Sequence, residues 1–378
     1  MAQNLEGLRI VTITTTLDRK AGGAGVAFAL YARALRTLGA NVEVWTISGG
    51  GPLLDELAAD GFPNRILGLA KHSHRFSTSR ALAKALAEHK PDWVHAHNYE
   101  PALHASRARK WGAIPGLIVT HHDPRLRWTR RLFNWPYRNV PDAIIVPSAS
   151  GARAYQRWLR FPAERMSVLA NPLPDVFFAD PARDEAVAGE LGLSGRYPVM
   201  AWVGRLGRLK GHADLLQAMT SIVGRYPRAL LLLVGRGKLE EELHQLTNKL
   251  GLSENVRFLG HRSDVPALLA LLDIFVCPSH GEVLCTAISE AMAMGKPVVS
   301  TTVWGAEDQI RHEESGLLVP IGDVRALGEA ILRLADDRDF AERLGRSAEA
   351  YARDRFTGAT FLDNLLRIYL GVIARRRA

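Results

Sequence analysis

Short apolar runs alternate with helical patterns along almost the whole chain, and this alternation limits the possible folds more than any other feature. In the first half, runs of strand length are separated by segments with helical spacing, such as 26–38 and 81–88. The runs are LRIVTIT, VEVWTI, DWVHAH, LIVTHH and DAIIVPS. This rhythm predicts parallel strands joined by crossover helices.

A second series of the same kind follows a connection rich in proline and aspartate that begins near Asn171. Its runs are YPVMAWVG, ALLLLVG, VRFLG, DIFVCPS and KPVVST. Because 378 residues exceed one ordinary core, we expect two Rossmann-like, doubly wound α/β domains that face a central cleft. The expected parts are an N-terminal domain over 1–170, a linker over 171–198, a C-terminal domain over 199–355, and a helix over 356–378 that crosses back onto the first domain.

The chain has no sequence feature of a membrane-spanning or secreted protein. No run of about 18 apolar residues exists, and Asp18, Arg19 and Lys20 follow the apolar start too closely for a spanning helix. The only two cysteines are Cys277 and Cys285, which argues against a disulfide framework. We therefore expect a reduced protein in the cytoplasm.

The net charge of +9 belongs to the first half of the chain. Residues 1–170 contain 23 Lys and Arg against 12 Asp and Glu, whereas residues 171–378 contain 25 against 27. The basic residues gather with aromatic ones between Arg107 and Arg138, and the set that we assign to the acceptor or membrane side is Arg125, Arg127, Trp128, Arg130 and Arg131. This pattern favours an anionic membrane surface at the inner face of the cytoplasmic membrane; nucleic acid and a solvated helix face are the alternatives.

Two acids, Glu282 and Glu290, lie in the stretch PSHGEVLCTAISEAMAMGKPVVS. The first stands in a loop, and the second stands in a helix-forming run that Gly295 and Pro297 end. Ionised carboxylates accept hydrogen bonds from hydroxyl groups, and a helix N-terminus attracts anions, so this junction can hold a sugar and a phosphate together. The alternative is a helix with a solvated glutamate.

A basic loop, VGRLGRLKGHADLL, follows the first strand of the second series. Arg205 and Lys210 stand there between glycines, at the entry of a helix. Arginine can clamp a diphosphate through two hydrogen bonds, and glycines allow the backbone to approach it, so the loop predicts phosphate binding. Its glycine spacing fits neither a Walker loop nor a dinucleotide fingerprint.

Taken together, these segments resemble the family 4 retaining glycosyltransferases of GT-B fold (glycosyl transferases group 1). The resemblance covers almost the whole chain, with the motifs in family order: GGAG, VHAHN, VTHHD, VGRLGRLKG, LLLVGRG, VRFLGHRSDVPALLALLDIFVCPS, the Glu282 to Glu290 stretch and SGLLVP. It implies transfer of a sugar from a nucleotide-diphosphate sugar with retention of configuration, with no metal and no cofactor beyond this co-substrate.

The resemblance also implies a role for each matching residue of the second domain. Arg205 and Lys210 match the pair that neutralises the donor diphosphate and stabilises the leaving group. Glu290 matches the acid that binds ribose, and Glu282 matches the acid that contacts the donor sugar. The backbone amides that match the loop around sugar and phosphate belong to Leu284, Cys285 and Thr286.

In the first domain, Gly22 and Gly23 match a turn over the diphosphate, and His122 matches the histidine beside the reacting carbon. The chain departs from the family in two places. It has Glu-Val-Leu-Cys over 282–285 where Glu-Gly-Phe-Gly is usual, and Trp304, Gly305 and Asp308 replace the usual Gly-Gly-any-any-Glu turn. A rival interpretation is a hydrolytic metal site at the predicted strand ends, formed by His95, His97, His121, His122 and Asp123. An inverting reaction with His122 or Asp123 as general base is another.

We therefore expect a glycosyltransferase whose partners are a nucleotide-sugar donor, a cell-surface glycan or lipid-linked acceptor, and an anionic membrane surface, with no nucleic acid. The acceptor would be of the polysaccharide or lipopolysaccharide type. Two other classes stay open at this stage. One is a different GT-B enzyme, such as a nucleotide-sugar epimerase or a phosphorylase, and the other is a non-catalytic protein that binds polyanions.

Overall fold

The computed structural model describes residues 4–18, 23–69, 76–122, 140–179, 184–282 and 284–377. The chain forms two compact units. Unit 1 combines Met1–Asn171 with Ala359–Ala378, and unit 2 comprises Pro172–Gly358. From Pro172 onward, the segment that the sequence suggests as a linker belongs to unit 2 and includes the short helix α6 (Glu185–Glu190).

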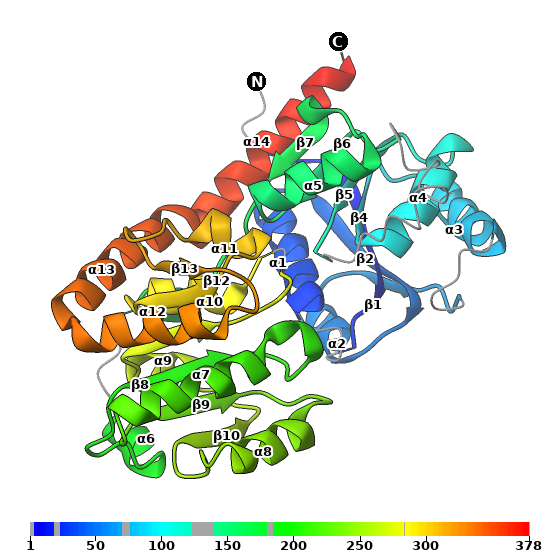
Figure 1. Ribbon diagram of the computed structural model, residues 1–378. Coiled ribbons are helices and arrows are strands. Elements are labelled where there is room, and N and C mark those ends of the chain that lie inside the picture. The colour runs from blue at the N-terminus through cyan, green and yellow to red at the C-terminus, as the bar shows by residue number, and fades with distance from the viewer. Residues whose placement is uncertain are drawn as a thin grey trace. The chain divides into compact units, whose positions relative to one another are not determined.

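Unit 1 is built on a seven-stranded parallel sheet with the order β3-β2-β1-β4-β5-β6-β7 (Figure 1). A helix follows each strand from β1 to β4 along the chain, as the apolar runs predict. Its strands are β1 (Arg9–Thr16), β2 (Asn41–Gly49), β3 (Asn64–Ile66), β4 (Trp93–His97), β5 (Gly116–Thr120), β6 (Ala143–Val146) and β7 (Met166–Val168). Its helices are α1 (Gly23–Thr37), α2 (Pro52–Ala59), α3 (Phe76–His89), α4 (Tyr99–Lys110) and α5 (Ala149–Leu159).

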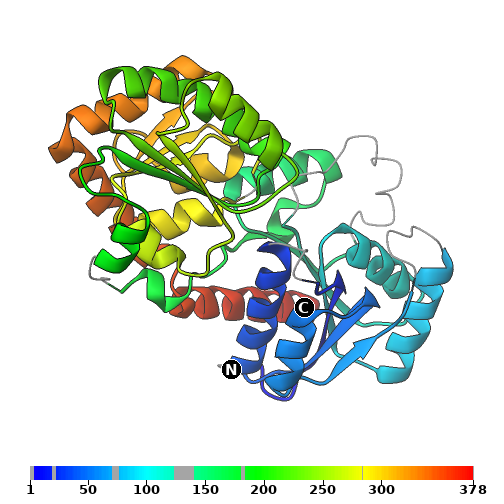
Figure 2. The same ribbon diagram turned by 90° about the horizontal axis from the view of Figure 1, so that it is seen from below.

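The last helix, α14 (Gly358–Arg377), completes the core of unit 1. Its inward residues share one buried cluster with Phe28, Tyr31 and Trp93; they are Phe361, Leu365, Tyr369 and Val372. Both views place α14 beside α1 (Figures 1 and 2), and the rings of Phe361 and Tyr31 meet edge to face at 5.0 Å. The expectation that the C-terminal helix packs on the first domain is therefore confirmed.

Unit 2 has a six-stranded parallel sheet with the order β10-β9-β8-β11-β12-β13. Its strands are β8 (Val199–Val203), β9 (Leu230–Val234), β10 (Val256–Gly260), β11 (Ile274–Cys277), β12 (Val298–Thr301) and β13 (Leu317–Val319). The further helices are α7 (His212–Arg225), α8 (Glu240–Lys249), α9 (Val265–Ala270), α10 (Thr286–Ala293), α11 (Trp304–Gln309), α12 (Val324–Asp336) and α13 (Arg338–Arg355). The sheet supplies fully buried residues such as Met200, Leu231 and Val276 to the core.

In each sheet the strand order reverses once, at a switch point between two neighbouring strands. The candidate site lies at the switch point of unit 2. In unit 2, β9 lies on one side of β8 and β11 lies on the other, so the chain leaves the carboxyl ends of β8 and β11 in opposite directions. Ligands of doubly wound sheets bind in the crevice at such a point. In unit 1 the corresponding neighbours are β1 and β4. The predicted α/β class with two parallel sheets is confirmed.

Within the described ranges, no helix combines the length and the apolar character needed to cross a bilayer.

Candidate functional site

The switch point of unit 2 brings together a lysine and a glutamate that are 72 residues apart in the sequence. Lys210 lies in the loop after β8, and Glu282 lies in the loop after β11. The ammonium of Lys210 donates to Oε1 of Glu282, and Ser279 Oγ donates to the same oxygen over 3.3 Å. The two charged side chains are only 24% and 13% exposed, so water screens their attraction less than it would on an open surface.

The electrostatic surroundings keep Lys210 charged. Burial acts to lower the pKa of its ammonium, but the carboxylate of Glu282 and the sulfurs of Cys285 and Cys277 together outweigh burial, so the pKa lies above its ordinary value. Arg205 stands in the same loop and is exposed. Its guanidinium makes no ion pair with any residue in the described part of the chain. The loop therefore offers the paired Lys210 and two exposed arginines, Arg205 and Arg208, to an anionic ligand.

Backbone contacts fix the shape of this basic loop. The amide of Gly204 donates to Val234 O over 2.8 Å, and that of Leu206 donates to Arg236 O over 3.0 Å. At its end, Gly211 has a φ of +65° and faces the carbonyl of Pro278 so closely that a Cβ would lie 1.8 Å from that oxygen. Only glycine fits there. The loop after β8 is thus pressed against the loop that contains Glu282.

Helix α10 begins directly after this second loop, with Cys285 as its N-cap residue. The Cys285 side chain caps none of the amides of the first turn, and its carbonyl accepts a 3.0 Å hydrogen bond from Gln309 Nε2. Cys285 has a φ of −92°, which any residue can adopt, so the family's usual glycine is not required at this position. Leu284 is half-buried and Thr286 is exposed. Val283 lies outside the described residues.

Glu290 stands in the second turn of α10 and is partly buried. Burial raises the pKa of its carboxyl from 4.5 to about 7. The acid is therefore divided between its neutral and ionised forms near neutral pH. A ligand whose hydroxyl groups donate to this carboxylate would favour the ionised form.

The predicted histidines of unit 1 form a buried stack. The rings of His95 and His97, both in β4, lie 4.5 Å apart, and the ring of His122, which follows β5, lies 6.0 Å from that of His97. Burial lowers the pKa of His122 to about 4 and that of His95 to about 3, so both imidazoles are neutral at pH 7. The backbone amide of His122 donates to Oδ1 of Asn98 over 3.0 Å.

This stack does not have the arrangement of a metal site. Both ring nitrogens of His95 are engaged, one with Thr120 Oγ1 at 2.6 Å and the other with the hydroxyl of Tyr369 at 3.0 Å. His121 points elsewhere and stacks on the ring of Tyr155 at 4.8 Å. Among the residues that the structure describes, no three His, Cys, Asp or Glu side chains are placed to hold a metal ion. Asp123 falls outside the described ranges.

Sequence reasoning gave no role to Asn98 or Tyr369, although both contact predicted histidines. Asn98 carried a weak signal, since it ends the quoted motif VHAHN; its backbone φ of +68° is unusual for a residue other than glycine. Tyr369 carried none. Of the first-domain glycines, Gly23 is the first residue of α1, whereas Gly22 lies outside the described residues. The basic and aromatic set from Arg125 to Arg131 also lies outside them.

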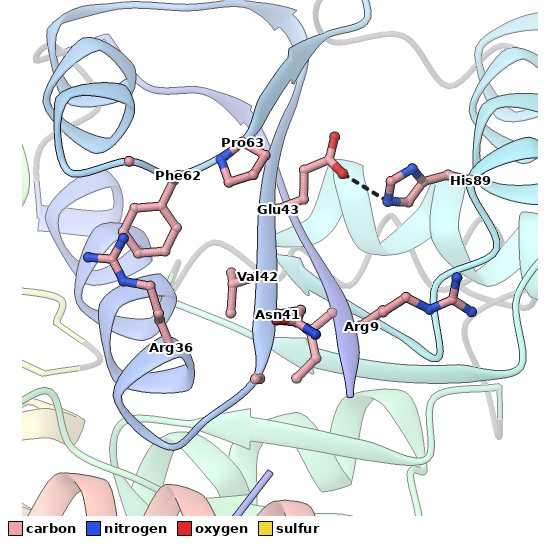
Figure 3. Close-up of a pocket in the computed structure, with 11 residues that line it drawn as sticks. Arg9, Arg36, Asn41, Val42, Glu43, Phe62, Pro63 and His89 are labelled. Carbon is pink, nitrogen blue, oxygen red and sulfur yellow. Dashed lines mark ion pairs between the residues drawn. The ribbon is translucent and has the colours of Figure 1, made fainter. Parts of the chain in front are cut away.

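Unit 1 has a separate cavity of about 340 Å³ at the end of its sheet opposite to the carboxyl ends of the strands (Figure 3). It lies beside the first residues of β1 and β2, Arg9 and Asn41, and thus at the amino ends of the strands. Its charged groups are paired within the protein. The ring of His89 contacts the carboxylate of Glu43 at 2.8 Å, and the guanidinium of Arg36 covers the ring of Phe62 at 3.8 Å. None of the predicted site residues lines it.

Comparison with known proteins identifies the family. The family model for glycosyl transferases group 1 matches residues 184–351, and that for Glycosyltransferase Family 4 matches residues 21–175. The lipopolysaccharide core biosynthesis glycosyltransferase LpsD of Rhizobium meliloti is 34% identical over 321 residues, which cover 80% of this chain and 83% of LpsD. A D-inositol 3-phosphate glycosyltransferase of Corynebacterium urealyticum is 26% identical over 92% of this chain and 90% of its own.

Solved structures share the fold. A crystal structure of Anabaena HepE in complex with UDP superimposes with a TM-score of 0.83 at 23% identity, over 96% of this chain and 99% of HepE. WaaG, a glycosyltransferase involved in lipopolysaccharide biosynthesis, superimposes with a TM-score of 0.75 at 20% identity, over 95% of this chain and 99% of WaaG. The chain therefore belongs to the family 4, group 1 glycosyltransferases, has the GT-B fold, and is a glycosyltransferase.

Proposed function

We propose that the chain transfers a sugar from a nucleotide-diphosphate sugar to a cell-surface glycan or a lipid-linked acceptor, with retention of the anomeric configuration. The observation that carries the proposal is the ion pair between Lys210 and Glu282 at the switch point of unit 2, directly before the helix that contains Glu290. Cations and acids meet there at the edge of the sheet where doubly wound proteins bind nucleotides.

The proposed roles follow from charge. Arg205 and Lys210 bind the diphosphate, and they stabilise the negative charge that develops on it when its bond to the anomeric carbon breaks. When the diphosphate takes over Lys210, the carboxylate of Glu282 becomes available to hydroxyl groups of the sugar. The amides of Leu284, Cys285 and Thr286 contribute donors for sugar and phosphate oxygens, and Glu290 accepts hydrogen bonds from ribose.

Unit 1 supplies the remaining groups. From the family resemblance we assign Gly22 and Gly23 to contact with the diphosphate, and His122 to contact with the reacting carbon. Because burial holds the pKa of His122 at about 4, its imidazole is neutral at pH 7 and carries no charge that would oppose an electron-poor anomeric carbon. The transfer requires neither a metal nor a cofactor.

The acceptor class is proposed from charge and from relatives. LpsD and WaaG are described as lipopolysaccharide glycosyltransferases, and the basic excess of the first 170 residues suits an anionic membrane surface. We place the enzyme in the cytoplasm, at the inner face of the membrane. Pelleting with anionic liposomes at low salt tests this placement, and protein that stays in the supernatant would remove it.

Donor turnover tests the catalytic proposal. Lys210→Ala and Glu290→Ala should each lower turnover by at least a hundredfold, because each removes a group that contacts the donor. Lys249→Ala is the matched control. Lys249 ends α8 shortly before β10 begins, so it lies near the amino ends of the strands, away from the candidate site. Full activity in either site variant would contradict the assignment. Analysis of the product's anomeric configuration, with and without acceptor, separates retention from inversion and transfer from epimerisation or phosphorolysis.

The donor itself can be found by thermal shift. A nucleotide sugar present at about 100 times its dissociation constant stabilises the protein by about 2.7 kcal/mol. A panel of UDP, GDP, ADP and dTDP sugars therefore shows which base and sugar the site accepts.

A further inference from the structure

The two cysteines of the chain meet at the candidate donor site. Cys277 is the last residue of β11 and Cys285 is the N-cap of α10, and their sulfur atoms lie 3.5 Å apart. Both are buried, with Cys277 fully inaccessible and Cys285 8% exposed. These are the only two cysteines among the 378 residues, and the fold places them side by side. The loop between them contains Ser279 and Glu282.

We propose that Cys277 and Cys285 form a reversible disulfide that lowers the affinity of the enzyme for its nucleotide sugar. The effect on affinity rests on the proposed function, whereas the disulfide itself rests only on the position of the two sulfurs.

The reaction needs a small oxidant, and hydrogen peroxide is the class that we assign. One sulfur attacks the peroxide, becomes a sulfenic acid and releases hydroxide, which takes up the thiol proton as water. The second sulfur then attacks the first, forms the S–S bond and displaces a second water. Two thiols and one peroxide thus give one disulfide and two waters, and a dithiol reductant reverses the change.

Access decides which sulfur meets the peroxide first. Cys285 is 8% exposed, whereas Cys277 is fully inaccessible, so Cys285 reacts first. Cys277, whose sulfur lies 3.5 Å away, then serves as the resolving thiol.

Closing the bond must move the helix rather than the strand. A disulfide has an S–S distance of about 2.05 Å, so the sulfurs must approach each other by roughly 1.5 Å. Cys277 is fixed by its place in β11, which is paired with β12 on one side and β8 on the other. Cys285 lies in the loop-to-helix junction, and its displacement shifts the first amides of α10 and the nearby carboxylate of Glu282. These are the groups that we assign to the sugar and the phosphate.

Mass spectrometry and binding together test the inference on the intact protein. Treatment with hydrogen peroxide should lower the mass by about 2 Da, for loss of two hydrogens, and peptide mapping should place the bond between Cys277 and Cys285. The affinity for the nucleotide sugar found by thermal shift should fall at least tenfold and recover with dithiothreitol. Cys277→Ser should keep the affinity of the reduced protein within about twofold and lose the response to peroxide; Cys277→Ala is the second variant should serine disturb packing.

Each other outcome is decisive. If peroxide yields only sulfenic or sulfonic acid, or no change at either sulfur, the disulfide is overturned. If the disulfide forms and the affinity is unchanged, the switch is overturned. If the reduced protein binds no nucleotide sugar at all, the proposed function fails instead. Amide hydrogen exchange over 278–293 then decides the inference, because the disulfide should slow exchange at the start of α10, and unchanged exchange would overturn it.

Discussion

Replacing Glu290 with glutamine should stabilise unit 2 at alkaline pH and remove a pH dependence that this residue imposes. Burial raises the pKa of the Glu290 carboxyl from 4.5 to about 7 in the folded protein. Below about pH 4.5 the carboxyl carries a proton in both the folded and the unfolded chain, so it contributes no difference. As pH rises to 7 the unfolded chain ionises first, and stability falls.

The size of the effect follows from the shift. One pKa unit corresponds to about 1.4 kcal/mol, so the ionised Glu290 lowers the free energy of unfolding by about 3 kcal/mol at pH 8 and by about 1 kcal/mol at pH 5.5. Glutamine has a similar shape and no charge. The stability gained in Glu290→Gln should therefore be about 2 kcal/mol larger at pH 8 than at pH 5.5.

Urea unfolding at the two pH values measures this difference. After equilibration in urea, the protein is exposed to a brief deuterium pulse at one fixed pH. The deuterium uptake of peptides from β12 then reports the unfolding of unit 2 separately from that of unit 1. Glu254→Gln is the matched control, because Glu254 is an exposed acid of the same unit; we expect it to change stability by less than about 0.5 kcal/mol at either pH. A gain from Glu290→Gln that is equal at pH 5.5 and pH 8 would refute the reasoning.

Two further predictions concern packing. Tyr369→Phe removes the 3.0 Å hydrogen bond to buried His95 and should lower the stability of unit 1 by about 1–3 kcal/mol, measured by thermal or urea unfolding; no loss would mean that the bond contributes nothing. An alanine in the left-handed conformation costs roughly 1–2 kcal/mol. Gly211→Ala should lower the stability of unit 2 by more than this, because the new Cβ would also clash with the carbonyl oxygen of Pro278. Gly207→Ala, with no atom nearer than 3.7 Å, is the control, and equal effects of both variants would contradict the geometry.

The sequence was sufficient to predict the layers of the fold and to indicate which loops of unit 2 meet at the candidate site. Apolar runs such as ALLLLVG can only be buried parallel strands when helical segments separate them, and the structure has β9 at this place. The meeting of Lys210 and Glu282 also follows once β8 and β11 are neighbours. That β8 and β11 are neighbours depends on the order of the strands in the sheet, and the local pattern of apolar residues does not predict strand order.

Other features depend on packing between distant segments. The hydroxyl of Tyr369 forms a hydrogen bond with His95, which is 274 residues away in the sequence, and no local sequence pattern predicts this contact. The raised pKa of Glu290 has burial as its cause, and burial is set by the surrounding chain rather than by the helix itself. Cys277 and Cys285 are close in the sequence, but their 3.5 Å separation requires the turn from β11 into α10.

The return of α14 to unit 1 sets the order in which the protein can fold as it is made. The first 171 residues leave the ribosome before unit 2 does, yet their core lacks Phe361, Leu365, Tyr369 and Val372 until α14 has been made. Unit 2 is continuous in the chain and has all its residues before α14 emerges. The half that is synthesised first is thus the half that can finish folding last, and until then it exposes an apolar face that chaperones would recognise.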